Sequence, residues 1–185
     1  MHATCSANCR LVLSVSALCA ELFHLGWEYT HGGVFAHHLL NNPDMPAISN
    51  WWGLLVIPLL TWWLVGRIQR SVMARRRGGE LNYQRGGIVP WTGFVAALVY
   101  GAALAIAFSL GSPFVNYLFF ALLALALVIR AWRAEFVLGF VLGMTFVFGA
   151  VLPTLIAGVV AALSWVAHAV AGVVWRRLRP RGGLV

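Results

Sequence analysis

Long apolar runs are the feature of this sequence that most limits what it can fold into. Several of them approach or exceed the roughly 20 residues that a helix needs to cross a bilayer. Of the whole chain, 61% of residues are hydrophobic and only 10% are charged. Backbone polar groups inside a bilayer must be paired within their own segment, so such runs form helices. The sequence therefore predicts an all-α, polytopic transmembrane helical bundle.

Turn-forming residues divide the apolar sequence into six predicted spans. The clearest breaks are 41–46, which contains two prolines, and the Gly-Ser-Pro segment 111–113. The apolar stretch 135–175 is too long for one span, and we divide it at 152–154. The predicted spans cover about 11–30, 50–68, 88–110, 113–130, 135–152 and 154–175. Five spans with a re-entrant final stretch are the main alternative.

Charged residues indicate how the spans are oriented. The formal net charge is +8, and the basic residues are all arginines. They gather in the predicted loop 67–87, after the fourth span and in the C-terminal tail, so the positive-inside rule places both termini in the cytoplasm. The predicted location is the inner (plasma) membrane, with membrane lipids as partners. No folded basic surface remains for nucleic acid, and we expect none to bind.

Three local signals refine this expectation. Ser49 and Asn50 predict a helix N-cap before the second span, and Pro58 lies within that span. Gly139 and Gly143 show the four-residue spacing of small residues that lets membrane helices pack closely. The glycine spacing would let the later helices pack closely, with association into a homo-oligomer or a larger membrane complex as a further possibility.

An ionisable stripe lies in the first predicted span. At 3.6 residues per turn, Glu21, His24, Glu28 and His31 fall within an arc of about 80° on one helix face. The whole chain has five acidic residues and six histidines, and the segment 21–44 holds three of the acids and four of the histidines. This concentration marks the segment as the candidate functional site.

Three further ionisable residues follow in the predicted extracytoplasmic loop 30–48. His37 and His38 are adjacent, and Asp44 lies between two prolines. Gly32 and Gly33 can end the first helix, but if the helix continues through them, His38 joins the stripe and His37 does not. The loop therefore has donors that could complete a site begun on the helix.

The stripe needs something that offsets its cost, because each ionisable group in the bilayer core costs about 2.5 to 3.5 kcal/mol or more. Glu-x-x-His spacing occurs twice and brings carboxylate and imidazole donors together, which suits a divalent transition metal such as zinc, iron or copper. The predicted metal ligands are His24, Glu28, His31, His37 and His38. Glu21 and Asp44 are the predicted catalytic residues, as general bases or as groups that orient the ligands.

These features predict a metal-dependent enzyme that acts on a lipid-like or other membrane-soluble substrate. Two other classes stay open: a proton or metal-ion transporter that uses the same stripe, and a non-catalytic subunit of a membrane complex. The stripe could also pair only with other helices. Outside it, His168 could add a ligand or pack within the sixth span, Asn50 could donate to the site, and Glu135 is expected to pair with nearby arginines.

Overall fold

The computed structural model of the chain describes residues 2–38, 44, 46–77 and 90–178. Within these residues the fold is helical, with one short hairpin near the C-terminal end of the first helix. The helices are α1 (His2–Thr30), α2 (Gly53–Arg77), α3 (Pro90–Ser109), α4 (Phe114–Val128), α5 (Ala134–Phe148) and α6 (Val151–Leu178). The hairpin pairs β1 (Ala36–His38) with β2 (Ala47–Ser49), and the 3-10 turn η2 (Asn50–Trp52) leads into α2.

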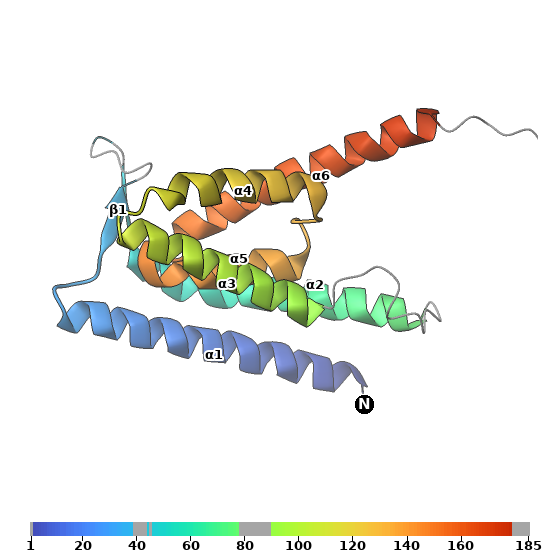
Figure 1. Cartoon of the computed structure of the whole chain (residues 1–185). Helices are drawn as coiled ribbons and strands as arrows, with labels where there is room; N and C mark the ends of the chain where they lie inside the picture. The colour runs from blue at the N-terminus through green and yellow to red at the C-terminus, as the bar shows by residue number, and fades with distance from the viewer. Residues whose placement is uncertain (1, 39–43, 45, 78–89, 179–185) are drawn as a thin grey trace, which may run out of the picture.

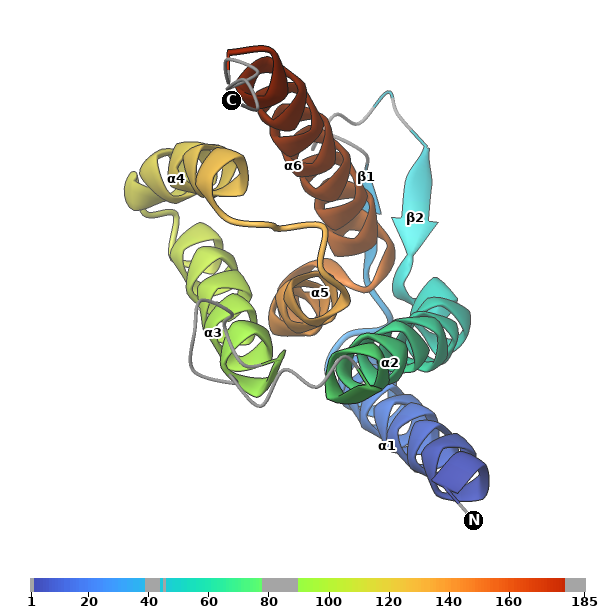
Figure 2. The same ribbon diagram turned by 90° about the vertical axis from the view of Figure 1, so that its right-hand side faces the viewer.

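Successive helices alternate in direction along the bundle. As a result α1 begins and α6 ends at the same end, while the β1–β2 hairpin lies at the other (Figure 1). Viewed end-on, α5 is central, with α3, α6 and α2 around it, and α1 lies against α2 at the edge of the bundle (Figure 2). The two helix pairs with the most extensive contact are α3 with α5 and α1 with α2.

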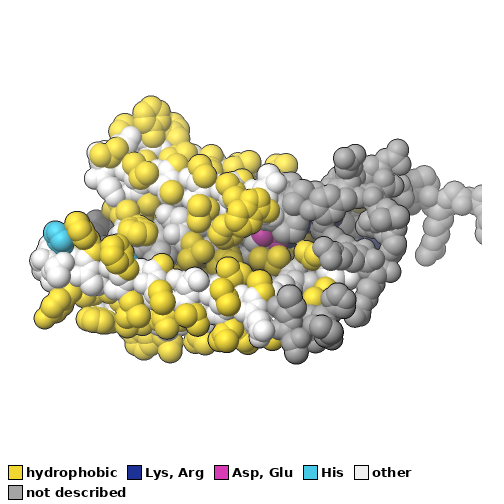
Figure 3. Space-filling model, turned by 90° about the horizontal axis from the view of Figure 1, so that it is seen from below, with side chains coloured by type: hydrophobic (Ala, Val, Ile, Leu, Met, Phe, Trp, Pro, Cys, Tyr) yellow, Lys and Arg dark blue, Asp and Glu magenta, His cyan; other side chains and the backbone are white. Residues whose placement is uncertain are grey.

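Four of the described helical segments are long and apolar enough to cross a membrane. They are Ala7–Thr30, Asn50–Ala74, Trp91–Ser109 and Val151–Leu178, whereas α4 and α5 are shorter. Hydrophobic side chains also cover most of the described surface on the side that carries α1 (Figure 3). An apolar exterior of this kind suits lipid and not water.

The α3–α5 seam is the closest helix contact, and glycines make it possible. A Cβ atom at Gly139 would overlap the carbonyl oxygen of Phe94, and one at Gly143 would overlap that of Leu98. On the facing helix, a Cβ at Gly101 would lie 2.6 Å from a carbonyl of α5. The backbones therefore touch where side chains would normally stand, which confirms the close packing predicted from the glycine spacing.

Helix boundaries differ from the predicted spans in three places. α1 begins at His2 and not near residue 11, because no proline or glycine interrupts the residues before the apolar run. α2 continues to Arg77, since arginine and glutamine favour helix although they lower hydropathy. The predicted loop residues 67–77 are thus helical. Residues 78–87 of that loop lie outside the described residues.

The break between α5 and α6 lies earlier than predicted. The chain turns at Gly149, whose φ is 66°, and α6 begins at Val151. Pro153 is therefore in the first turn of α6 and does not end α5. Proline is well tolerated there, because the amide hydrogens of a first helical turn have no partner within the helix.

The first helix ends at Thr30 and does not run on into the loop. Gly32 and Gly33 have φ values of 127° and 103°, which side chains rarely adopt, and β1 follows at Ala36. The β1–β2 pairing was not predicted, because three-residue strands are too short to show an alternating pattern.

Replacing Gly139 with alanine should weaken the bundle. Its Cβ would strike the Phe94 carbonyl, a backbone atom that cannot turn aside, so we expect Gly139→Ala to destabilise the protein by about 1–3 kcal/mol. The measurement is the thermal unfolding midpoint in detergent. Gly158→Ala is the matched control, since nothing lies within 4 Å of a Cβ there. An unchanged midpoint in Gly139→Ala would contradict the glycine seam.

Candidate functional site

Three members of the predicted stripe lie together and are buried. Glu21, His24 and Glu28 are 4%, 5% and 6% exposed and occupy the face of α1 that turns toward α2 and α5. Their spacing of three and four residues keeps them on this face through two turns of helix. The predicted alignment is therefore correct for these three residues.

Glu28 is the most fully bonded of the three. Its Oε1 accepts a hydrogen bond of 2.7 Å from Asn50 Nδ2, and its Oε2 accepts one of 3.3 Å from the backbone amide of Phe35. The backbone amide of Asn50 in turn donates to the Phe35 carbonyl at 3.0 Å. One carboxylate thus joins the end of α1, the segment before β1 and the start of η2.

Asn50 reaches Glu28 because the chain places it at the beginning of a helical turn. Ser49 caps η2 by accepting a hydrogen bond from the Trp51 amide, which confirms the predicted N-cap. Asn50 is 3% exposed, and its Oδ1 lies where a Cβ of Gly149 would be. The turn between α5 and α6 therefore needs glycine both for its φ and for the space that Asn50 occupies.

His24 is held between two carboxylates. Its Nε2 lies 3.5 Å from Glu28 Oε1, and its Nδ1 lies 4.0 Å from Glu21 Oε2. The imidazole ring also contacts the ring of Phe146 on α5, with 4.8 Å between centroids. Because Glu28 is fixed by Asn50 and Phe35, it orients the imidazole so that Nε2 faces Glu28.

Glu21 lies against the first residue of α2. A Cβ atom on Gly53 would overlap Glu21 Oε1, so only glycine leaves room for the carboxylate. The N-terminus of a helix also carries partial positive charge, which favours a carboxylate there. Glu21 Oε1 and His24 Nδ1 are nevertheless both buried without a hydrogen-bond partner.

These two atoms belong to side chains that line a cavity of about 580 Å³ between α1, α2, α3 and α5. The volume falls in the range of small-molecule sites. The rest of the wall is mainly apolar, and its other polar side chains include Thr61, whose buried Oγ1 has no hydrogen-bond partner, and Thr145 beside Phe146. The cavity extends from this polar end to Cys9, Gln69 and Trp91 near the opposite end of α1.

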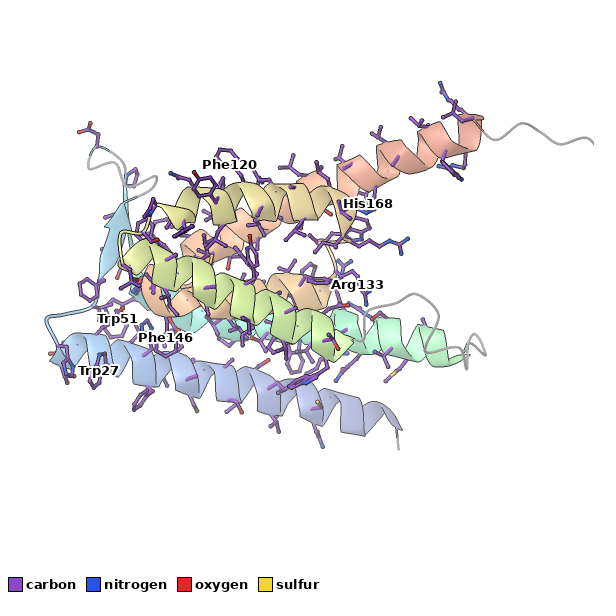
Figure 4. All side chains as sticks on the ribbon, in the orientation of Figure 1. Trp27, Trp51, Phe120, Arg133, Phe146 and His168 are labelled. Atoms are coloured by element: carbon purple, nitrogen blue, oxygen red, sulfur yellow. The ribbon has the colours of Figure 1, made fainter. Side chains whose placement is uncertain are left out.

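The structure does not bring His31 to this group, although the sequence predicted it there. The helix ends one residue earlier, and the exposed His31 ring stacks on Trp27 with 3.7 Å between centroids. Its Nδ1 is 2.9 Å from the Trp27 carbonyl oxygen. Trp27 and Trp51 lie at the hairpin end of the bundle (Figure 4). Asp44 is also exposed, in the segment between the strands, whereas Glu21 and His24 are buried.

His37 and His38 contribute their backbones to β1, opposite Ile48 and Ala47, but their side chains lie outside what the structure describes. Among the described side chains, no three histidine, cysteine, aspartate or glutamate groups are arranged to hold a metal ion. The metal site of zinc, iron or copper, with His24, Glu28, His31, His37 and His38 as ligands, therefore stays a prediction.

Sequence reasoning gave Asn50 only as one possible donor and missed Gly53 and Phe146. None of these has a local pattern that points to Glu21 or His24. At the other end of the bundle, His168 Nδ1 lies 2.9 Å from the Ser164 carbonyl oxygen of its own helix, far from Trp27 (Figure 4). Glu135 pairs with Arg133, as predicted.

Comparison with protein-family models, with curated proteins and with solved structures finds no match to this chain.

Replacing Asn50 with leucine should destabilise the protein. Leucine is similar in size but cannot donate to Glu28, and a buried carboxylate that loses a partner costs about 2–4 kcal/mol. Thermal unfolding in detergent would measure the loss. The double variant Asn50→Leu/Glu28→Leu should recover part of it, because no unpartnered charge remains. Strictly additive effects of the two substitutions would show that the two side chains are not coupled.

Proposed function

We propose that the protein is an integral membrane enzyme that uses His24 for acid–base chemistry on a lipid-like, membrane-soluble substrate. The substrate would occupy the cavity between α1, α2, α3 and α5, with its reacting group at Glu21 and His24. An apolar cavity with a few convergent polar groups at one end is typical of a site for an amphiphilic small molecule.

One observation carries this proposal. Glu21 Oε1 and His24 Nδ1 are buried, lack hydrogen-bond partners, and belong to side chains that line the cavity. A buried polar atom without a partner costs roughly 1–3 kcal/mol. A group that supplies both missing partners from within the cavity would offset this cost.

Each residue of the group would have a defined part in the reaction. With the Nε2 hydrogen of His24 facing Glu28, Nδ1 is free to accept a proton from a substrate O–H or N–H. Glu28 would then stabilise the imidazolium ion, as a carboxylate does beside the histidine of a hydrolase triad. Glu21, on the other side of the ring, would orient the substrate hydrogen.

We further propose that all six helices span the inner membrane with both termini in the cytoplasm. The alternating helix directions support this orientation, as do the arginines at the end of the bundle where α1 begins, among them Arg133 (Figure 4). The site would then lie in the outer half of the membrane. α4 and α5 have 15 residues each, or about 22 Å, so they would cross only with their flanking turns.

A bound metal is the second candidate for the chemistry of this site. Glu21 Oε1 and His24 Nδ1 are the donor types that zinc, iron and copper accept, and neither has a partner in the protein. They would supply two ligands, and the others would have to come from water or from side chains outside the described residues. Such a metal would act as a Lewis acid or redox centre.

Replacing His24 with glutamine should abolish turnover of the substrate. General acid–base catalysis contributes about 10²–10⁴-fold, so we expect a loss of at least 100-fold. The assay places the purified protein in vesicles made from the lipid extract of the cells that express it. Mass spectrometry then follows every lipid species over time.

His168→Gln is the matched control, because its ring lies at the opposite end of the bundle, where it hydrogen-bonds to the Ser164 carbonyl and packs against Trp132. It should keep wild-type activity. If the wild-type protein converts no species, or if His24→Gln converts it equally fast, the enzymatic proposal is wrong.

Elemental analysis tests the metal candidate. Protein purified in detergent without a histidine tag should contain close to one zinc, iron or copper per chain. His24→Ala should lose it, since His24 is inside the buried group, and His31→Ala should keep it, since His31 stacks on Trp27 outside that group. Wild-type protein that takes up none of these metals, even after they are added back, would rule this candidate out.

A further inference from the structure

We infer that the cavity selects a single-chain amphiphile whose head group donates a hydrogen bond, an alcohol or an amine, over one with an anionic or donor-free head. This inference rests on the proposed function, because it names the class of molecule that the Glu21–His24 end of the cavity would take.

At the end of the cavity beside Gly53, Glu21 and His24 offer acceptors. The hydroxyl of Thr61, which also lines the cavity and has no partner, lies eight residues farther along α2, a rise of about 12 Å. His24 directs Nε2 to Glu28, which leaves the lone pair of Nδ1, and Glu21 Oε1 is a carboxyl oxygen. The hydroxyl hydrogen of Thr145 is already donated to the Val141 carbonyl at 2.7 Å, so Thr145 can only accept. A ligand must therefore bring the hydrogen.

The same arrangement disfavours an anionic head group. A carboxylate or phosphate would bring a negative group close to Glu28 and to the carboxyl group of Glu21, with no described arginine at this end of the cavity to balance it. The side-chain amide of Asn50 already donates to Glu28. A methyl ester offers only acceptors and would leave Glu21 Oε1 and His24 Nδ1 unpartnered.

The length of the cavity sets the length of the chain. Its lining residues on α1 extend from His24 to Cys9, a rise of about 22 Å at 1.5 Å per residue. Since C–C bonds of about 1.5 Å advance an extended chain by roughly 1.25 Å per carbon, 14 to 18 carbons would fill it. Ile57 and Leu138 line the path, and Trp91 and Phe94 stand at its far end.

The experiment compares four probes with the same 16-carbon chain: hexadecanol, hexadecylamine, palmitate and methyl palmitate. Each is added at equal mole fraction to wild-type protein in detergent micelles, and native mass spectrometry measures the fraction of protein that carries one molecule. We expect hexadecanol and hexadecylamine to bind about tenfold more tightly than the other two, the effect of one hydrogen bond to a buried charged acceptor.

Variants locate the binding. Glu21→Leu and His24→Leu should lose the preference among head groups while they still bind the chain. Ala20→Phe should reduce binding of all four probes, because Ala20 lines the cavity. Leu22→Phe is the matched control: Leu22 is exposed on the same helix and does not belong to the cavity wall, so binding should not change.

Three results would overturn the inference: equal or tighter binding of palmitate or methyl palmitate by wild-type protein, no binding of any probe, or no effect of Ala20→Phe. The wild-type comparison decides the first two without relying on any variant to fold. If wild-type protein binds all four probes equally tightly and Ala20→Phe abolishes that binding, only the head-group inference fails. The cavity would still admit lipid-like molecules. The proposed enzymatic function fails separately, in the conversion assay with His24→Gln.

Discussion

The hydrogen bond from Asn50 to Glu28 is the interaction on which the rest of the site depends. In a bilayer no water is available to hydrogen-bond a buried carboxylate, so its partners must come from the protein. Asn50 and the Phe35 amide provide them, and in doing so they fix the end of α1 to the start of η2 and to the segment before the hairpin. With Glu28 held, the His24 ring has one orientation, and its Nδ1 is left on the side of Glu21.

The bundle contains two kinds of helix contact, one between α3 and α5 and the other between α1 and α2. α3 and α5 meet at Gly101, Gly139 and Gly143, where the backbones approach too closely for any side chain. α1 instead packs along α2, where Gly53 accommodates Glu21 and Gly66 lies beneath the guanidinium of Arg10. Because α1 keeps to α2, a space remains between it and the α3–α5 pair, and this space is the cavity. The tight seam thus gives the cavity a firm wall.

Much of the fold could be predicted from local patterns. Apolar length identified the helices, and helical periodicity correctly placed Glu21, His24 and Glu28 on one face. The same periodicity failed at His31, because it assumes that the helix continues. Two glycines with positive φ follow Thr30, and the His31 ring is free to stack on Trp27. The helix boundary predicted at Pro153 was wrong for a related reason. Proline disrupts the interior of a helix but is well tolerated in its first turn.

The sequence by itself determined that the chain is helical and apolar, that glycines allow close contact, and that an ionisable stripe must be buried at a cost. Each of these follows from residue types at fixed local spacing. Only the tertiary structure decided that Asn50 donates a hydrogen bond to Glu28, that Gly53 leaves space for the Glu21 carboxyl group, and that the Phe146 ring contacts the His24 ring. Asn50 lies 22 residues from Glu28 along the chain, and Gly53 and Phe146 lie farther from their partners, so no local period connects them. Which atoms remain without partners, and therefore what the cavity can bind, is a property of the packed helices.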